Sequence, residues 1–413
     1  MNMVQINTIL EGNIFENANF VCNYNNQYMK KIGLVGAGTM GLGIALAASQ
    51  SGCDVLIFES NESAQLRARQ NIQKHFDKEQ ARNKLDSAAA TEQMSRLHFV
   101  RSVKELFTCE IVIEAIIEEL AVKRELFKEL SSIVSESCIL ATNTSSLSIS
   151  ALASGVSHPE RFVGIHFFNP AYLMKLVEII PAIQTSQNTI ELSKDLLSRC
   201  KKISVVAKDT PGFIVNRIAR PYYGEALRIF EEGLSRPEDI DFAMTQAGFK
   251  MGPFALMDFI GHDINYHVTE IVYNSFYQDP RYRPSLTQKR LVDAGFLGVK
   301  SGRGFYLYGE QAIMPSPSID PASAKVISDR IITMLINEAA DALYLQIASL
   351  EDIELSMTRG VNYPKGLLAW ADEIGIEEIV CRIDVLFDTY HDMRYRCSSL
   401  LRNMARQKKK FYT

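Results

Sequence analysis

A histidine and a glutamate placed 12 residues apart could form an acid–base pair. His166 lies in HFFNP and Glu178 in the LVEII that follows, and both segments have the apolar composition of strands. If NPAYLMK turns the chain back as a hairpin, the carboxylate lies beside the imidazole, orients it and stabilises its charged form. A lone histidine among apolar residues is more often structural. The spacing permits the pair, and both interpretations stay open at this point.

Two further segments place polar side chains where a ligand could bind. ATNTSSLSIS puts Asn143 and Ser145 just after an apolar run, and ligands of open α/β sheets collect at the carboxyl ends of strands. The same segment could simply cap a helix that begins near Ser148. Downstream, the Pro-Gly breaker in DTPGFIVNR marks a domain boundary near residue 208, and a helical pattern follows that carries Asn216 in its first turns.

A glycine-rich turn lies between two apolar runs within residues 30–60, which is typical of a βαβ unit. The turn GAGTMG consists of Gly36, Ala37, Gly38, Thr39, Met40 and Gly41. Its three glycines allow a tight turn, a close approach of the backbone to a pyrophosphate, and close packing of helix on strand. Glu59 ends the second run, where it can bind a ribose diol and would repel a 2′-phosphate. The pattern predicts a dinucleotide site that prefers NAD to NADP.

Strand-like runs and helical patterns alternate along the N-terminal half. The further runs lie at 110–115, 138–142 and 161–167, with a helical pattern at 121–134. This alternation predicts a Rossmann-type, doubly wound parallel sheet over residues 30–208. Residues 62–96 are charged and helical, and we expect an arm that leaves the sheet. The composition does not decide between a basic arm near a phosphate-bearing ligand and a solvated helical hairpin.

The C-terminal half contains an internal repeat with an offset of 113 residues. Three motifs recur at this offset: Glu225-Ala226 as Glu338-Ala339, Glu238-Asp239-Ile240 as Glu351-Asp352-Ile353, and Arg281-Tyr282-Arg283 as Arg394-Tyr395-Arg396. We expect two copies of one all-α domain, 209–308 and 324–413, joined by a linker at 309–323. The second copy lacks the PGF motif and has Asp329 in place of Asn216, so it should hold no second active site.

Composition excludes several classes of protein. With 413 residues and a net charge of -4, the chain carries no overall positive field for nucleic acid, and no apolar run reaches the length of a membrane span. Seven cysteines without metal-ligand spacing predict free thiols in the cytoplasm and no metal site. Residues 1–29 include eight asparagines but no lysine or arginine, and we expect a disordered extension. Met29, just before the first apolar run, is a candidate start of translation.

Five motifs of this chain resemble, in the same order, those of the NAD-dependent 3-hydroxyacyl-CoA dehydrogenases. They are GAGTMG, IEAIIEELAVKRELF, TNTSSLSI, HFFNP with MKLVE, and DTPGFIVNR, and the resemblance covers about residues 30–400. It implies that His166 is the catalytic base and Glu178 its orienting partner. It further implies that Ser145 and Asn216 contact the reacting oxygen.

The same resemblance extends to the cofactor and the substrate. It implies that Glu118 and Lys123, in EELAVK, contact the nicotinamide side of NAD, and we place Asn143 among the cofactor-binding residues. It also implies that the arm at 62–96 helps to hold coenzyme A. The implied reaction oxidises (S)-3-hydroxyacyl-CoA to 3-oxoacyl-CoA. Two alternatives are a non-catalytic NAD-binding protein of the same fold and a β-hydroxyacid dehydrogenase, whose catalytic group is a lysine.

The doubled tail, with NYPKGLLAW and RYRCSSLL, resembles the phenylacetate-degradation branch of the family, which oxidises 3-hydroxyadipyl-CoA. The distal carboxylate of that substrate could pair with Arg220 or Arg283, although arginines on helical domains usually face water. 3-Hydroxybutyryl-CoA is the other candidate substrate. In single-copy members the helical domains pair between two chains, which implies an internal pseudo-dimer here. Whether whole chains pair further as a homodimer stays open.

Overall fold

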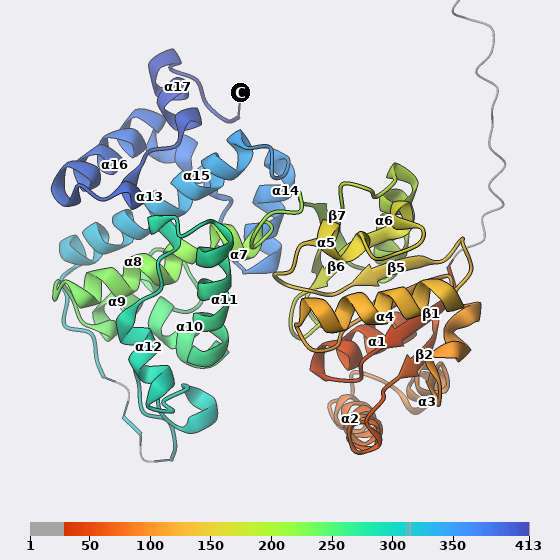
Figure 1. Cartoon of the computed structure of the whole chain (residues 1–413). Helices are drawn as coiled ribbons and strands as arrows, with labels where there is room; N and C mark the ends of the chain where they lie inside the picture. Colours follow the sequence, from red (N-terminus) through yellow and green to blue (C-terminus); the bar gives the residue numbers. More distant parts are fainter. Residues whose placement is uncertain (1–28, 311, 314, 413) are drawn as a thin grey trace, which may run out of the picture.

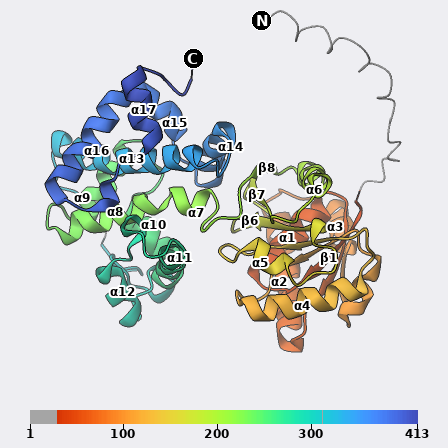
Figure 2. The ribbon, with the colours of Figure 1, turned by 45° about the horizontal axis from the view of Figure 1, so that its top comes forward.

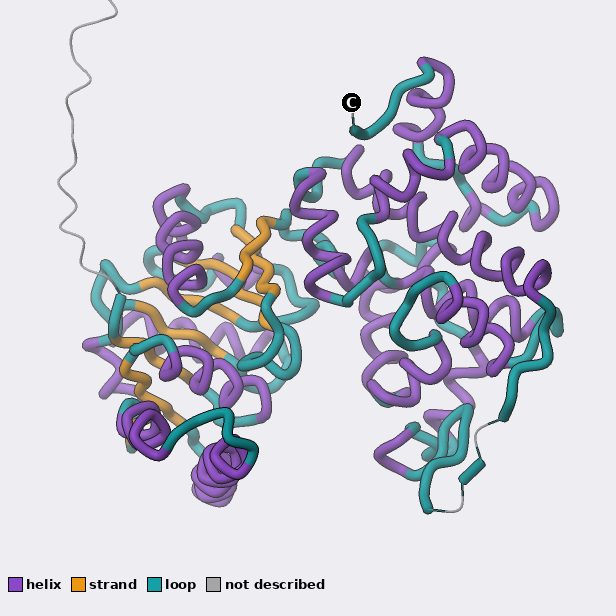
Figure 3. The backbone as a smooth tube through the Cα atoms, turned by 180° about the vertical axis from the view of Figure 1, so that it is seen from behind, coloured by secondary structure: helices purple, strands orange, loops and turns teal. Residues whose placement is uncertain are grey.

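The computed structural model describes residues 29–310, 312–313 and 315–412, so most of the predicted N-terminal extension lies outside the described residues. All strands lie in one part of the molecule, and the other part is built from helices (Figures 1 and 3). Helix α7 lies where the two parts meet (Figure 1).

The strand-containing part is a single sheet with the order β3-β2-β1-β4-β5-β6-β7-β8. The strands are β1 (Lys31–Val35), β2 (Asp54–Phe58), β3 (Leu97–Val100), β4 (Ile111–Glu114), β5 (Ile139–Thr142), β6 (Phe162–Phe167), β7 (Leu176–Pro181) and β8 (Ile203–Val206). The six strands from β3 to β6 are parallel, whereas β7 runs antiparallel to β6 and β8 runs parallel to β7. The predicted doubly wound sheet is confirmed, with β7 and β8 added in the opposite direction.

Helices cover both faces of this sheet. They are α1 (Thr39–Gln50), α2 (Glu62–Ala81), α3 (Ser87–Ser95), α4 (Leu120–Ile133), α5 (Ile149–Ala153) and α6 (Gln187–Arg199). Side chains of β4 alternate between two cores, because successive residues of a strand point to opposite faces. Ile111 and Ile113 join the core under α1 and α6, and Val112 joins the core under α4 and α5. The second core continues into the helical part of the chain.

The residues of the expected arm form α2 and α3, which project from the sheet (Figure 1). Asn61 and Asp86 cap the two helices, each accepting a hydrogen bond from a backbone N–H in the first turn. Only a narrow stripe of α2 is buried, formed by Ala68, Ile72 and Phe76 at helical spacing. Most of the remaining residues of α2 are polar and face solvent, as the charged sequence predicts, although Leu66 is also exposed.

Two groups of helices form the remaining part of the chain. The first comprises α7 (Val215–Ile218), α8 (Arg220–Glu231), α9 (Pro237–Gln246), α10 (Pro253–Ile260), α11 (His262–Ser275) and α12 (Leu286–Asp293). The second comprises α13 (Pro321–Tyr344), α14 (Leu350–Leu355), α15 (Leu367–Ile374), α16 (Ile376–Tyr390) and α17 (Ser399–Gln407). The linker predicted at 309–323 is too long at its C-terminal end, because Asp320 caps α13 and the helix begins at Pro321.

The two helical groups exchange equivalent ion pairs. Arg217 in the first group donates from Nε to Glu338 Oε1 of the second at 2.6 Å. The residues 113 positions away reverse this contact, since Arg330 donates from Nε to Glu225 Oε2 at 3.0 Å. Such an exchange is the pattern of an isologous interface, in which the same surface occurs on both sides. Figure 2 shows α8 and α13 side by side at this contact.

Candidate active site

His166 and Glu178 lie directly opposite each other on β6 and β7. The predicted hairpin is confirmed, and the two side chains point to the same face of the sheet. His166 Nδ1 lies 2.6 Å from Glu178 Oε2. Glu178 is fully buried, and 6% of His166 is exposed. The imidazole of His166 is therefore paired with a carboxylate, and His166 is not an isolated histidine among apolar side chains.

A bend in the chain before α7 holds the Glu178 carboxylate. Gly212 and Phe213 both have positive φ values, 74° and 48°, and the second is uncommon for a bulky residue. After this bend the N–H groups of Ile214 and Val215 both donate to Glu178 Oε1, at 3.1 and 3.0 Å. Successive N–H groups arranged in this way form an anion-binding nest. The PGF motif thus positions the carboxylate that orients the histidine, a role that the sequence alone did not reveal.

Aromatic rings flank the imidazole on two sides. The ring centroid of His166 lies 4.7 Å from that of Phe168 and 5.9 Å from that of Phe213. Nδ1 of His166 is hydrogen-bonded to Glu178, whereas Nε2 forms no hydrogen bond with the described residues. The arrangement leaves Nε2 as the nitrogen that can exchange a proton with a bound molecule.

The glycine turn lies at the start of α1, next to the end of β4. Gly36 has a φ of 99°, and a Cβ built there would lie 2.6 Å from the Ala115 carbonyl oxygen. A Cβ on Gly41 would lie 2.0 Å from the Gly36 carbonyl oxygen. A Cβ on Gly38, in contrast, would meet no protein atom within 4 Å. Two glycines are thus needed for packing, and the middle one borders open space.

These features fit a dinucleotide. No side chain caps the N-terminus of α1, where Gly38 and Thr39 are exposed and Met40 is partly buried. Its free N–H groups and helix dipole therefore suit a pyrophosphate. Glu59 accepts hydrogen bonds from the N–H groups of Ala37 and Asn61, both at 3.0 Å. A carboxylate has about four acceptor positions, so Glu59 can still accept from a ribose diol.

Substitutions at two of the glycines should separate cofactor binding from folding. We expect Gly38→Ala to leave the melting temperature of the free protein unchanged but to weaken NADH binding about tenfold, because its methyl group enters the space of the pyrophosphate. Gly41→Ala should lower the melting temperature, because its methyl group meets backbone. Fluorescence titration with NADH and thermal unfolding measure the two effects. Unchanged NADH affinity in Gly38→Ala would contradict this assignment.

A buried ion-pair network lies at the ends of β4 and β5. Lys123 Nζ is 2.5 Å from Glu114 Oε1 and 3.2 Å from Glu118 Oε2. Glu114 also accepts from Thr142 Oγ1 at 2.7 Å and from Ile116 N at 2.7 Å. Lys123 is only 1% exposed, and its ammonium group lies between the two carboxylates. Lys123 thus positions Glu118, and the expected contact of Lys123 with the nicotinamide side of NAD stays a prediction.

The Glu118 side chain is partly exposed and reaches the loop after β5. It accepts hydrogen bonds from Thr144 Oγ1 at 2.5 Å, Ser145 N at 3.0 Å and Ser146 Oγ at 3.0 Å. Burial raises the pKa of Glu118, but Lys123 and these hydrogen bonds outweigh burial and hold the pKa below its ordinary value. Glu118 is thus an ionised carboxylate held in place at the carboxyl ends of β4 and β5. Glu114, which binds Lys123 and Thr142 at the centre of this network, was not predicted from the sequence. The pattern that could have identified it is a charged residue at the end of an apolar strand.

The other predicted residues surround the same edge of the sheet. Asn143 Oδ1 accepts from the Phe167 N–H at 2.9 Å and so ties the end of β5 to the end of β6. Ser145 is partly exposed, and its hydroxyl has no partner among the described residues. Asn216 directly follows Val215, which binds Glu178, and its side chain also has no partner within the described part of the chain. Ser148 caps α5, so the capping interpretation holds for that serine.

Known protein families account for nearly the whole described chain. The model of the 3-hydroxyacyl-CoA dehydrogenase NAD-binding domain matches residues 31–210. The model of the 3-hydroxyacyl-CoA dehydrogenase C-terminal domain matches twice, at 212–308 and 326–411. The chain belongs to the 3-hydroxyacyl-CoA dehydrogenase family. It is accordingly an oxidoreductase, and NAD is its cofactor.

Some similar proteins align with more than nine tenths of this chain, and others align with about two thirds of it. The chain is 35% identical to the 3-hydroxyadipyl-CoA dehydrogenase of Escherichia coli strain K12, over 91% of this chain and 98% of that protein. It is 38% identical to the 3-hydroxybutyryl-CoA dehydrogenase of Bradyrhizobium diazoefficiens, over 68% of this chain and 96% of that one. A crystal structure of 3-hydroxybutyryl-CoA dehydrogenase from Escherichia coli K12 superposes with a TM-score of 0.86 at 35% identity, covering 92% and 98% of the two chains.

Other features of this dehydrogenase bear on the remaining expectations. No cluster of histidine, cysteine, aspartate or glutamate suited to a metal ion is found among the described residues. In the same part of the chain, no helix combines the length and the apolar character that crossing a membrane requires. The described cysteines are free thiols: Cys53, Cys109, Cys138, Cys200, Cys381 and Cys397.

Proposed function

We propose that this dehydrogenase oxidises (S)-3-hydroxyacyl-CoA to 3-oxoacyl-CoA, with His166 as the catalytic base. The observation that carries the proposal is the hydrogen bond between His166 Nδ1 and the buried Glu178 carboxylate, at 2.6 Å. It leaves Nε2 without a hydrogen bond to the described residues, so its lone pair is available to accept a proton. Bound NAD supplies the hydride acceptor for the hydrogen on carbon 3.

His166 and Glu178 have distinct roles in the proton transfer. Nε2 removes the proton of the 3-hydroxyl group, and the imidazole becomes positively charged. The Glu178 carboxylate, fixed by two backbone N–H groups, stabilises that charge without moving. In the reverse direction the imidazolium returns the proton to the developing alkoxide.

We assign the unpartnered polar groups of Ser145 and Asn216 to the reacting oxygen. Ser145 follows β5, which pairs with the strand that carries His166, and Asn216 follows the nest that binds Glu178. A hydroxyl and an amide can both donate to an alkoxide as its charge develops. Glu118 and Lys123, which form an ion pair, contact the nicotinamide side of NAD in this proposal. Asn143, which joins the ends of β5 and β6, also binds the cofactor.

Glu178→Gln should lower kcat about 10- to 100-fold, because the neutral amide no longer stabilises the imidazolium by a charge-assisted hydrogen bond. The affinity for NADH should not change, because Glu178 faces the histidine and the bend before α7. Steady-state kinetics and fluorescence titration measure the two quantities. A fall in NADH affinity as large as the fall in kcat would indicate a structural role for Glu178.

We further propose that the two helical copies form an internal pseudo-dimer, divided from the sheet domain near residue 208. The reciprocal contacts of Arg217 with Glu338 and of Arg330 with Glu225 support this organisation. The free thiols support a reducing compartment, the cytoplasm. Analytical ultracentrifugation of the whole protein tests whether two chains pair further.

The formation of reduced nicotinamide with 3-hydroxyacyl-CoA substrates of increasing length tests the activity. The (S) enantiomers should be oxidised, and the (R) enantiomers serve as controls. An absence of turnover with every (S) substrate, in a protein that binds NADH, would favour a non-catalytic NAD-binding protein.

A further inference from the structure

A cavity of about 410 Å³ lies beside α8, where the two helical copies meet. Five arginines line it: Arg220, Arg228, Arg281, Arg283 and Arg394. Arg281 and Arg283 come from the RYR motif of the first copy, and Arg394 comes from its repeat in the second. None of the residues that we assign to the active site lines this cavity. The repeated motif thus builds a separate, arginine-rich cavity at the junction of the copies.

Three of the five arginines are balanced by carboxylates within the protein. The pairs are Arg228 with Glu225 at 2.9 Å, Arg281 with Asp341 at 2.9 Å, and Arg394 with Glu232 at 3.8 Å and with Asp392 at 3.7 Å. One carboxylate, Glu231, also lines the cavity, and it accepts hydrogen bonds from Ser285 Oγ and Thr287 N. The capacity of the cavity to bind an anion therefore depends on the other two arginines.

These two, Arg220 and Arg283, have no carboxylate partner among the described residues. Arg283 is exposed, so water solvates its charge, whereas Arg220 is only 7% exposed. Burial lowers the pKa of Arg220 below its ordinary value, and Tyr223 and Tyr363 oppose this effect only in part. Because a buried charge without a counter-charge is unfavourable, an anion bound beside Arg220 would stabilise it.

The guanidinium of Arg220 is held in place and still has free donors. Nε donates to the Asn216 backbone oxygen at 2.9 Å, and Nη1 donates to Thr269 Oγ1 at 3.1 Å. The Tyr223 ring lies 4.9 Å from its central carbon. A guanidinium has five N–H donors, so both hydrogens of Nη2 and one of Nη1 remain for a ligand. The arginine is therefore oriented before any ligand binds, which favours binding.

The charge and the walls of the cavity indicate the class of ligand. Two unpaired guanidinium groups are balanced by a phosphate monoester, which carries a charge of about -1.5 to -2 at pH 7, whereas a single carboxylate leaves one of them unbalanced. The oxygens of a phosphate also match the planar donor fork of arginine. A free phosphate ion would fill little of the volume. The rest of the wall suits an organic group, because it includes Tyr223, Leu227, Pro284 and Leu286.

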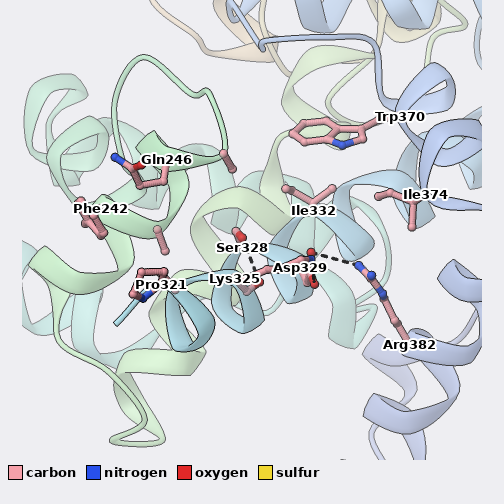
Figure 4. A pocket seen from close by; sticks show the side chains of 13 residues that line it. Phe242, Gln246, Pro321, Lys325, Ser328, Asp329, Ile332, Trp370, Ile374 and Arg382 are labelled. Atoms are coloured by element: carbon pink, nitrogen blue, oxygen red, sulfur yellow. Dashed lines mark hydrogen bonds and ion pairs between the residues drawn. The ribbon is translucent and has the colours of Figure 1, made fainter. Parts of the chain in front are cut away.

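A second cavity at the junction of the copies, of about 400 Å³, lacks this excess of positive charge (Figure 4). Its two cations, Lys325 and Arg382, both bind Asp329, at 2.6 and 3.2 Å. Arg382 also binds Glu378 at 2.7 Å. The charges that line this second cavity are therefore balanced without a ligand.

The sequence repeat does not reproduce the arginine-rich cavity in the second copy. At the offset of 113 residues, Thr333 stands in place of Arg220, and Asp341 stands in place of Arg228. Both differences remove a positive charge, and Asp341 adds a carboxylate that pairs with Arg281. The cavity therefore belongs to the first copy.

We propose that Arg220 and Arg283 bind a small organic phosphate monoester in this cavity, at a site separate from those of NAD and the acyl-CoA substrate. The proposal does not rest on the proposed function, because it depends on the helical part of the chain and on binding alone.

The test is calorimetric titration of the whole protein with phenyl phosphate and phenyl sulfate, which have the same shape but differ in charge. NAD and coenzyme A are present at saturation, so that their own sites are filled. Phenyl phosphate should bind at least about tenfold more tightly, because it balances both arginines. Arg220→Met should weaken its binding about 10- to 100-fold, and Arg283→Met should weaken it less. Arg220→Lys, which keeps the charge without the planar fork, should give an intermediate affinity.

A matched control is Arg382→Met, which removes an arginine from the cavity whose charges are balanced, and it should leave the affinity for phenyl phosphate unchanged. Melting temperature and NADH affinity show that each variant is folded. Equal affinities for the two probes, loss of binding in the presence of NAD and coenzyme A, or the same weakening in Arg382→Met and Arg220→Met would each overturn the proposal.

Inorganic phosphate separates the two sources of the same anion. It should bind more weakly than phenyl phosphate, because it leaves the apolar wall of the cavity uncovered. An equal affinity would indicate a site for the free ion and would overturn the choice of an organic ester. Since no turnover is measured, each of these failures leaves the proposed function intact.

Discussion

Replacement of His166 by glutamine should lower kcat by about 10²–10⁴-fold. Glutamine can still form a hydrogen bond with Glu178, but its amide does not accept a proton near neutral pH. The proton of the 3-hydroxyl then has no acceptor at the position of Nε2. NADH affinity should persist, because the glycine turn and Glu59 follow other strands, β1 and β2. Single-turnover kinetics with a saturating substrate, together with fluorescence titration, measure both quantities.

A second buried histidine–carboxylate pair provides a matched control. His262 Nε2 lies 2.6 Å from Asp258 Oδ1, and both residues are fully buried in the first helical group. Its Nδ1 lies 3.3 Å from Gln288, so neither ring nitrogen faces a substrate. His262→Gln should therefore lower the melting temperature with kcat retained. Full turnover in His166→Gln, or equal losses of kcat in the two variants, would refute the assignment of the base.

Replacement of Glu338 by glutamine should lower the free energy of unfolding of the helical part by about 3–5 kcal/mol, because it removes one of the two carboxylates, Glu338 and Asp341, that balance the buried guanidinium groups of Arg217 and Arg281. Arg217 Nε and the Tyr282 hydroxyl lie 2.6 and 2.5 Å from Glu338 Oε1, and Arg281 Nη1 lies 3.4 Å from Oε2. Urea unfolding followed by fluorescence of Trp370, the single tryptophan, reports on this part of the chain.

The same variant should change how stability depends on pH. Burial raises the pKa of Glu338, but Arg281 and Arg217 outweigh burial, so the pKa in the folded state lies below its ordinary value. The contribution of Glu338 is therefore present above the unfolded pKa of about 4.3 and is lost as the pH falls through the folded pKa. The difference in stability between wild type and Glu338→Gln should shrink on acidification below about pH 4.

An exposed ion pair serves as the comparison for Glu338. Lys365 and Glu373 pair on the surface of the second copy, with 40% and 57% of their side chains exposed. Glu373→Gln should change the free energy of unfolding by less than about 1 kcal/mol. If Glu338→Gln had an effect as small as this, the pairs between the two copies would not hold the helical part together.

Local patterns in the sequence were sufficient for much of the fold. Apolar runs predicted β4, β5 and β6 to within a residue or two, and the glycine spacing predicted the βαβ unit. The runs at Leu97–Val100 and Ile203–Val206 were not predicted as strands. Both are four residues long, and each forms its hydrogen bonds on only one side, at an edge of the sheet. Such strands owe their conformation to a neighbour distant in sequence more than to their own composition.

Residue types and spacing were enough to identify the groups that could do chemistry: a histidine and a glutamate on two strands of a hairpin, whose side chains lie on the same face. Tertiary structure alone decided which charges are satisfied. It turns the N–H groups of Ile214 and Val215 toward Glu178 and buries Lys123 between two carboxylates. It also buries Arg220 with no carboxylate partner in the part of the chain that the structure describes. The physical reason is that the energy of a charge depends on its solvation and on partners brought together from distant parts of the chain. A residue's type and spacing do not report either quantity.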